Sequence, residues 1–236
     1  VWMYRTRVMG EARYLMVIPY FHIYAFTVGM LTATWIGAKQ IIIPKYDVEQ
    51  VLMAIKTHRP TFLPAVPTIF ISLLSHPRAH EYGLDQVRTF NSGGAPCPVE
   101  VIAEFERRTG RPLKEGYGLS ETSPVTHSTP QLAIRKPGTI GLPISDTDIK
   151  LVDVETGTRV LPWGECGELC ISGPQVMKGY WNKPEATAQT FIDGWVRTGD
   201  LARLDEEGFC YIIDRAKDML IRGGENIYCI EVENLL

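Results

Sequence analysis

Short apolar runs and stretches of helical periodicity alternate through the first half of the chain. The runs have the length of buried strands and end at proline, glycine or polar residues, while the stretches between them are long enough for helices. The predicted strands are residues 14–18, 40–43, 61–66, 87–91 and 113–115, and the predicted helices are residues 24–36, 48–57, 67–74 and 100–109. Because strand and helix alternate, residues 1–130 are predicted to form an α/β subdomain with a mostly parallel sheet and flanking helices.

Two of these helices carry clear local signals. Asp47 is a typical N-cap for the helix at 48–57, whose apolar residues at positions 48, 51, 52 and 55 share one face. Gly110 follows the helix at 100–109 and predicts its end.

Residues 15–38 contain no Asp, Glu, Lys or Arg, and a stretch of this length could span a bilayer. Pro19, His22 and Gly29 interrupt it, however, and a strand followed by a buried helix explains it as well. We therefore expect no transmembrane span, while a peripheral contact with a membrane stays open.

Beyond residue 134 the pattern changes. Glycine and proline recur between short apolar runs such as residues 149–154, 168–172 and 208–213. This spacing is typical of small antiparallel strands, so residues 131–214 are predicted to form a β-rich subdomain, a distorted barrel. A helix is expected to begin at 183–187, because Pro184 occupies a position typical of a first turn.

The composition is that of an ordinary globular protein, since 45% of the 236 residues are hydrophobic and 22% are charged. The net charge of −3 provides no basic field, which argues against nucleic acid as a partner. The five cysteines lack the paired CxxC spacing of a zinc site. We interpret them as reduced, mostly structural thiols of a cytoplasmic protein.

The candidate chemistry is concentrated in residues 115–123. Two glycines flank Tyr117, whose ring could stack on a base, and glycine allows a ligand to approach the backbone closely. Ser120 and Thr122 could bond phosphate oxygens, and Glu121 is the kind of hard oxygen ligand that Mg²⁺ takes beside a phosphate.

Taken alone, residues 115–123 could equally form a polar turn with a capping hydroxyl. Residues 92–96, a second glycine-bearing stretch, also follow a predicted strand directly. Because the carboxyl ends of parallel strands meet at one edge of a sheet, where ligands bind, the two stretches together favour a binding site.

Four stretches in this order resemble the adenylate-forming superfamily, which includes acyl-CoA synthetases, luciferase-like enzymes and the adenylation domains of peptide synthetases. They are residues 92–96, 117–122, 195–200 and 214–218 continuing into 223–227, with further matches at 167–169, 173, 179–180 and 182–187. The resemblance covers nearly the whole chain. Residues 19–22 and 221–228 are most similar to the fatty-acyl-CoA ligase branch.

The resemblance implies roles for individual residues, which are expectations for the structure. The adenine and acyl-carboxylate site would be lined by Gly93, Gly94, Ala95 and Pro96, and by Gly116, Tyr117 and Gly118, with Tyr117 stacked on adenine. Ser120, where the superfamily usually has Thr, would bond the α-phosphate beside Thr122, and Glu121 would hold Mg²⁺. Asp200 would accept hydrogen bonds from the ribose hydroxyls, and Arg215 would reach the ribose or a phosphate. His22 would lie near the acyl carboxylate. Lys217 would be the hinge of a small C-terminal domain that begins at residue 215.

Several of these residues have simpler interpretations. Asp200 could be a turn residue after Gly199, and His22 could be a buried histidine with satisfied hydrogen bonds. Arg215 and Lys217 could form a solvated charge cluster. Phe26, which the resemblance places near an acyl tunnel, is more typical of a core residue than of a gate.

The resemblance implies an ATP-dependent ligase that activates a fatty carboxylic acid as an acyl-adenylate and then forms a CoA thioester. Its small-molecule partners would be the acid, ATP with Mg²⁺, and CoA. Adenylation of an aryl or amino acid for a carrier protein, or a non-catalytic nucleotide-binding role, remain alternatives. The sequence indicates no oligomeric state.

The sequence departs from the superfamily in three places. No glycine- and hydroxyl-rich phosphate loop with its lysine precedes His22, and the catalytic lysine of the C-terminal domain would lie beyond Leu236. Cys229 stands where proline is frequent. The last residues, 231–236, are predicted to be helical, so we expect the 236 residues to be a fragment that is inactive, or nearly so, by itself.

Overall fold

A computed structural model describes residues 11–130, 134–217, 220–222 and 225–227, and for the last two segments the backbone alone. The chain divides into two compact units, Val1–Gly138 and Thr139–Leu236, which are described separately. The expected features at 223–224, 229 and 231–236 lie outside the described residues.

The first unit contains most of the predicted elements. Its strands are β1 (Arg13–Met16), β2 (Lys39–Ile42), β3 (Phe62–Ala65), β4 (Thr89–Ser92), β5 (Leu113–Gly118) and β6 (Val125–Ser128). Its α-helices are α1 (Thr32–Trp35), α2 (Val48–His58), α3 (Pro67–Ser75) and α4 (Val99–Thr109), with a π-helix η2 (Ala25–Leu31) and 3₁₀ turns η3 (Ala79–Tyr82), η4 (Leu84–Gln86) and η5 (Ser120–Thr122).

The strands of this unit form one sheet in the order β2-β1-β3-β4-β5-β6. Pairing is parallel from β2 to β5 and antiparallel between β5 and β6. The predicted α/β class with a mostly parallel sheet is therefore confirmed. Strand β6 escaped prediction because its sequence, Val-Thr-His-Ser, has no apolar alternation.

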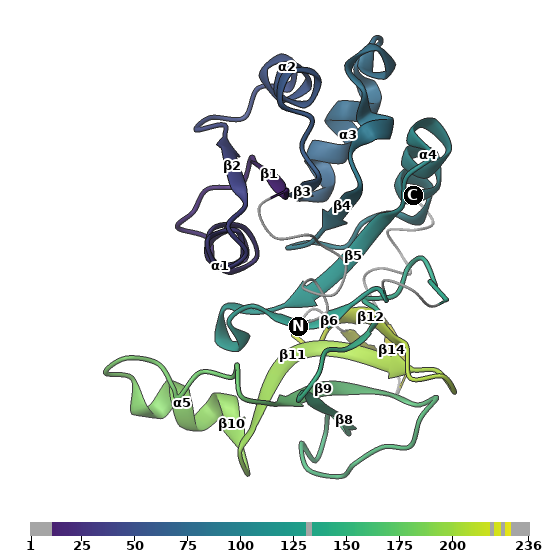
Figure 1. The fold of residues 1–236 in the computed structure, drawn as a ribbon. Coiled ribbons are helices and arrows are strands. Elements are labelled where there is room, and N and C mark those ends of the chain that lie inside the picture. Colours follow the sequence, from purple (N-terminus) through teal and green to yellow (C-terminus); the bar gives the residue numbers. More distant parts are fainter. Residues whose placement is uncertain (1–10, 131–133, 218–219, 223–224, 228–236) are drawn as a thin grey trace. The chain divides into compact units, whose positions relative to one another are not determined.

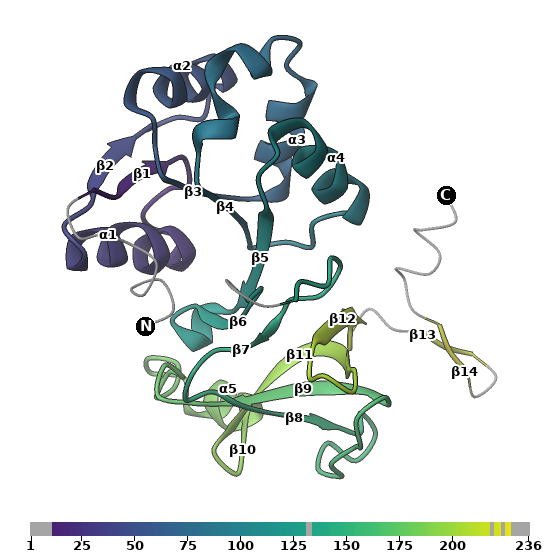
Figure 2. The ribbon, with the colours of Figure 1, turned by 45° about the vertical axis from the view of Figure 1, so that its right-hand side comes forward.

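Helices cover both faces of the sheet, and the side chains along β1 alternate between the two apolar clusters that result. Leu15 and Val17 belong to one apolar cluster with α2, α3 and α4, whereas Tyr14 and Met16 belong to a second cluster with residues of η2 and α1. Figures 1 and 2 show α2, α3 and α4 on one side of the sheet and α1 on the other. Because both faces are buried there, β1 and β3 are mainly apolar runs rather than alternating ones.

The helix predicted at 24–36 is helical, but its first part is the π-helix η2 and only its last turn is α1. Phe26 is 38% exposed, so its assignment to the core was wrong. The other side of the segment explains its apolar character, because Ala25, Gly29 and Ala33 are buried against the sheet. No helix among the described residues is long and apolar enough to cross a membrane.

Helix α2 begins as predicted, since the Asp47 carboxylate accepts the Gln50 N–H at 2.9 Å. Replacing this cap by alanine leaves an amide of the first turn without its partner, and we expect Asp47→Ala to lower the free energy of unfolding by about 1 kcal/mol. Urea denaturation measures this change. Asp47→Asn keeps an acceptor at the same place, so an equal loss in both variants would contradict the capping role.

The second unit is built on antiparallel pairing. Its elements are β7 (Leu142–Pro143), β8 (Asp148–Val152), β9 (Cys166–Ser172), α5 (Pro184–Thr190), β10 (Phe191–Ile192), β11 (Trp195–Leu204), β12 (Cys210–Arg215), β13 (Leu220–Arg222) and β14 (Glu225–Ile227). The main sheet has the order β10-β11-β9-β8, with β12 paired to β11. The β-rich character predicted for this region is confirmed, and β11 continues through Gly199 and Asp200.

Candidate functional site

The two glycine-bearing stretches of the first unit lie against each other. A Cβ atom built on Gly93 would be 3.3 Å from the carbonyl oxygen of Gly116 and 3.2 Å from the Tyr24 ring. Gly94 has a φ of +82°, a conformation that side chains rarely adopt. The loop after β4 therefore approaches β5 closely because two consecutive residues lack side chains, and it exposes Ala95 and Pro96 to solvent.

Tyr24 supports this junction. Its buried hydroxyl donates to the Asn91 side-chain oxygen at 2.5 Å, and the Asn91 amide donates to the carbonyl of Lys114 at 3.4 Å. Burial raises the pKa of Tyr24, so the hydroxyl remains a donor. Tyr24 was not predicted as a site residue, and the one signal in the sequence is Asn91, a polar residue at the end of a predicted strand.

The turn after β5 is held by Thr122. Its side-chain oxygen accepts the Leu119 N–H at 2.9 Å and its hydroxyl donates to the Pro124 carbonyl at 2.7 Å. Since Thr122 is fully buried, its hydroxyl shapes the turn. Ser120, which is exposed, and Glu121, which is half-buried, are the polar side chains of η5 that reach the surface.

Tyr117 is braced by its cross-strand partner. It pairs in register with His127 on β6, and the two rings meet edge to face with centroids 5.8 Å apart. Burial lowers the pKa of His127 to about 3, so the imidazole is neutral at physiological pH. An uncharged, fixed ring thus holds one side of the half-buried Tyr117.

His22 lies just before the helix that carries Tyr24, and its Nδ1 accepts the Tyr24 N–H at 3.2 Å. The side chain is exposed, so the interpretation of His22 as a buried histidine was wrong. This local hydrogen bond orients the His22 ring.

The second unit places Asp200 and Arg215 opposite each other on β11 and β12, with the carboxylate Oδ1 3.2 Å from the guanidinium Nε. Asp200 is 4% exposed, and its N–H donates to the Thr198 hydroxyl oxygen. Because Asp200 lies inside a strand, it is not a turn residue. Lys217 follows in a turn after β12 and is exposed.

An ion pair between the partly exposed Arg197 and the buried Glu168 holds the strand just before Asp200. Glu168 on β9 binds the Arg197 guanidinium and also accepts the Gly199 N–H at 3.1 Å. Its carboxylate raises the pKa of Arg197. Because Glu168 binds both the Arg197 side chain and the Gly199 N–H, it fixes the backbone of β11 directly before Asp200.

Among the described residues, no three or more His, Cys, Asp or Glu side chains gather as a metal site. A Mg²⁺ ion that accompanies a phosphate substrate takes only one or two protein carboxylates, and the phosphate and water supply its other ligands. Glu121 alone on its turn fits such an ion.

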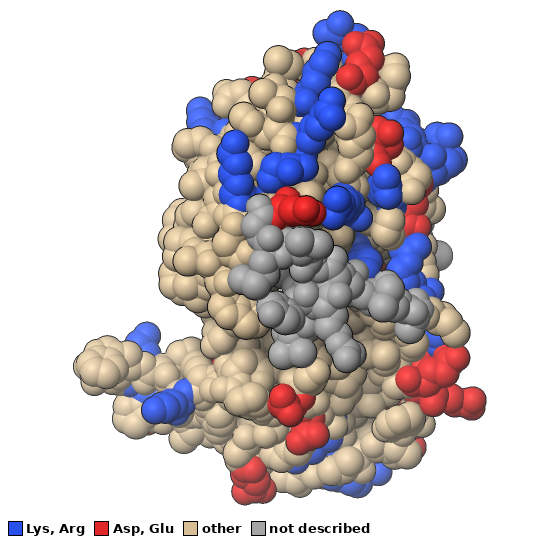
Figure 3. Space-filling view, viewed as in Figure 1, with Lys and Arg blue, Asp and Glu red and all other residues tan. Residues whose placement is uncertain are grey.

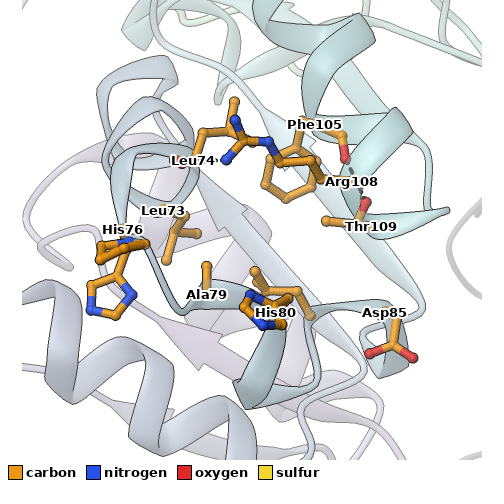
Figure 4. A pocket seen from close by; sticks show the side chains of 11 residues that line it. Leu73, Leu74, His76, Ala79, His80, Asp85, Phe105, Arg108 and Thr109 are labelled. Atoms are coloured by element: carbon orange, nitrogen blue, oxygen red, sulfur yellow. Dashed lines mark hydrogen bonds between the residues drawn. The ribbon is translucent and has the colours of Figure 1, made fainter.

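A pocket of 490 Å³ lies elsewhere in the first unit, between α3, η3 and α4 (Figure 4). Its polar groups are largely engaged: His76 binds Glu49 at 2.7 Å, Arg108 donates to the Leu74 carbonyl at 2.7 Å, and Thr109 donates to the Phe105 carbonyl. None of the predicted site residues is among its described lining. It is therefore not the candidate site.

Figure 3 shows Lys and Arg interspersed with Asp and Glu on the upper part of the face in view. Exposed ion pairs on α4 account for part of this mixture, since Glu104 binds both Arg107 and Arg108. Paired and solvated charges of this kind do not make an anion site.

Residues 1–181 match the family described as AMP-binding enzyme. The chain belongs to this family. The superfamily resemblance stated from the motifs is thereby confirmed.

Two curated relatives illustrate the range within the AMP-binding enzyme family. The long-chain-fatty-acid–CoA ligase of Bacillus subtilis (strain 168) is 48% identical over 100% of this chain and 42% of its own length. A feruloyl-CoA synthase of an Amycolatopsis species is 39% identical over 98% of this chain and 47% of its own length. The chain thus spans less than half the length of these relatives.

Solved structures share the fold. ATP-bound MatB from Rhodopseudomonas palustris has a TM-score of 0.90 at 34% identity and covers 96% of this chain and 44% of its own. O-succinylbenzoate coenzyme A synthetase (MenE) from Bacillus subtilis, in complex with ATP and magnesium ion, has a TM-score of 0.84 at 33% identity, covering 98% of this chain and 47% of its own.

Proposed function

We propose that the full-length protein is an AMP-forming acid–CoA ligase that activates a fatty carboxylic acid with ATP. The observation that carries the proposal is the contact of the Gly93 loop with Gly116, beside Tyr117 and the η5 turn. The glycines allow a nucleotide to approach the backbone closely. The ring of Tyr117, the hydroxyl of Ser120 and the carboxylate of Glu121 suit its base, its phosphate and the accompanying metal ion.

In the proposed reaction the acid carboxylate attacks the α-phosphate in line and pyrophosphate leaves, after which the CoA thiol attacks the acyl-adenylate. The protein has to position these groups and to stabilise negative charge. Ser120 would bond the α-phosphate and Glu121 would hold Mg²⁺, which neutralises phosphate charge when it is bound. Tyr117 would stack on adenine.

Asp200 and Arg215 are proposed to bind the ribose and phosphate. Their ion pair fixes the Asp200 carboxylate, and the exposed Arg215 side chain retains donors for a ligand. Lys217 is proposed as the hinge, since it is exposed in the turn that follows β12. His22 is proposed to lie near the acyl carboxylate.

Fatty acids are the favoured substrates because the relative with 48% identity is named a long-chain-fatty-acid–CoA ligase. The feruloyl-CoA synthase at 39% identity makes an aryl acid the second candidate. ATP–pyrophosphate exchange by the full-length protein, with long-chain, medium-chain, aryl and amino acids, separates them. Exchange with aryl or amino acids and none with fatty acids would refute the fatty-acid assignment.

Asp200→Asn tests the ribose role. The amide keeps the shape but loses the charge that strengthens two hydrogen bonds, so we expect the KM for ATP to rise about tenfold with a smaller change in kcat. Asp153→Asn, on a surface turn of the same unit, serves as the control. An unchanged KM for ATP in Asp200→Asn would exclude a ribose contact.

A further inference from the structure

The pairing of β5 with β6 is irregular at the candidate site. Tyr117 pairs with His127, and the next residue, Gly118, pairs with Val125. Thr126, which lies between these two partners on β6, is therefore an extra residue in the ladder. A bulge of this kind bends its strand and changes the direction of nearby side chains, and bulges are frequent beside active sites. The irregularity falls at Tyr117, the residue proposed to stack on adenine.

The side chain of Thr126 forms hydrogen bonds inside this bulge, where it is fully buried. Its hydroxyl donates to the Tyr117 carbonyl oxygen at 3.4 Å, and the hydroxyl oxygen lies 3.0 Å from Nδ1 of His127. A hydroxyl has one proton and a carbonyl oxygen only accepts, so the proton of Thr126 points to Tyr117. The Thr126 oxygen is then the acceptor for an N–H at Nδ1 of His127.

His127 supplies that N–H. Its side chain is fully buried, and burial lowers its pKa to about 3, so the ring is neutral and carries a single N–H. Its Nε2 has no hydrogen-bond partner among the described residues. Since a buried donor without a partner is rarer than a buried acceptor without one, the proton belongs on Nδ1, where Thr126 accepts it. The hydrogen bonds therefore run in one direction, from His127 through Thr126 to the Tyr117 carbonyl.

His127 also contacts the side chain of Tyr117 directly. The two rings lie edge to face, with centroids 5.8 Å apart and an angle of 70° between their planes. The hydrogen bonds restrain the backbone of Tyr117, and the ring contact restrains its side chain. A group that is already fixed in its bound orientation loses less conformational entropy when a ligand binds.

We propose that His127 and Thr126 are positioning residues for the nucleotide, which hold the Tyr117 ring in the orientation that stacks on adenine. This inference rests on the proposed function. Both side chains are 0% exposed, so they touch Tyr117 and not the ligand. The hydrogen bond to Thr126 also explains why a polar ring occupies a buried position, because an apolar ring would leave the Thr126 hydroxyl without its donor.

The test is ATP–pyrophosphate exchange by the full-length protein. His127→Ala removes both restraints and should raise the KM for ATP about tenfold, with kcat changed less than about threefold. Thr126→Val keeps the shape but removes both hydrogen bonds, and should raise the KM for ATP about threefold. The KM for pyrophosphate, which has no base, should stay unchanged in both variants. Ser128→Ala is the control, because the Ser128 hydroxyl is also buried on β6 but donates to the Thr129 carbonyl.

A double-mutant cycle tests whether His127 acts through Tyr117. Tyr117→Ala should raise the KM for ATP by about tenfold or more, because base stacking is lost. Adding His127→Ala to Tyr117→Ala should raise it no further. A further rise of about threefold or more in the double variant would overturn the positioning role.

The other outcomes separate the two proposals. A wild type without exchange, or a Tyr117→Ala variant with the wild-type KM for ATP, contradicts the proposed function or the place of Tyr117 in it. If Tyr117→Ala raises the KM for ATP while folded Thr126→Val leaves it at the wild-type value, the positioning role is overturned, even if His127→Ala does not fold. A rise in the KM for pyrophosphate equal to that for ATP would also overturn it.

Discussion

Glu121→Ala is expected to lower ATP–pyrophosphate exchange by the full-length protein by about 100-fold or more. The carboxylate of Glu121, the proposed Mg²⁺ ligand, stands on the short η5 turn, whose shape is set by Thr122. Loss of the ligand should therefore reduce the stabilisation of phosphate charge in the transition state and should also raise the Mg²⁺ concentration needed for half-maximal rate.

The magnesium titration makes this prediction specific. Glu121→Gln keeps the size and polarity of the side chain but removes its charge, so it should resemble Glu121→Ala in rate. Glu104→Ala, on the surface of α4, removes a carboxylate that binds only arginines and should leave the rate and the magnesium dependence unchanged. A rate within threefold of wild type for Glu121→Ala would exclude Glu121 as the metal ligand.

Gly118→Ala is expected to lower the free energy of unfolding by about 3 kcal/mol or more. A Cβ atom at this position would lie 1.6 Å from the carbonyl oxygen of Pro124, which is backbone and cannot rotate away. The β5–β6 hairpin would have to open, and the bonds of Thr122 to Leu119 and Pro124 would be lost with it. Denaturation in urea measures the loss.

Gly116→Ala is a matched control for this stability measurement. Gly116 lies on the same strand, but its added Cβ would be 3.5 Å from its nearest neighbour, the Asn91 amide nitrogen, which is an ordinary contact. We expect a loss of about 1 kcal/mol or less. Equal losses of stability in the two variants would show that the loss of glycine's backbone flexibility, and not the lack of space for a Cβ atom at Gly118, determines the change in the free energy of unfolding.

The fold of the first unit could be predicted because its strands are buried on both faces and its helices are amphipathic. β1 and β3 are continuous apolar runs, and Asp47 and Gly110 mark helix ends by their own chemistry. The π-helix at Ala25–Leu31 could not be predicted, because an apolar stretch has the same pattern in either kind of helix. Phe26 was misassigned for the same reason.

The candidate site was located from glycines and polar residues after strands, but its supports were not. Tyr24 and His127 act through contacts with Asn91 and Tyr117, which lie 10 or more positions away in sequence, and no local pattern encodes such contacts. Thr122 was chosen for its hydroxyl as a phosphate ligand, whereas the structure uses that hydroxyl to close the turn. Whether the hydroxyl of Ser120 or that of Thr122 is left to bind a ligand depends on the backbone conformation of η5.

The sheet order has a consequence for synthesis. β2 joins one side of β1, β3 joins the other side, and β4, β5 and β6 are then added one after another to the growing edge. Each strand from β2 to β6 therefore finds a neighbouring strand already made when it leaves the ribosome. The Gly93 loop and β5 come last in the parallel part, so the edge that carries the candidate site is completed only after both faces of β1 have been covered.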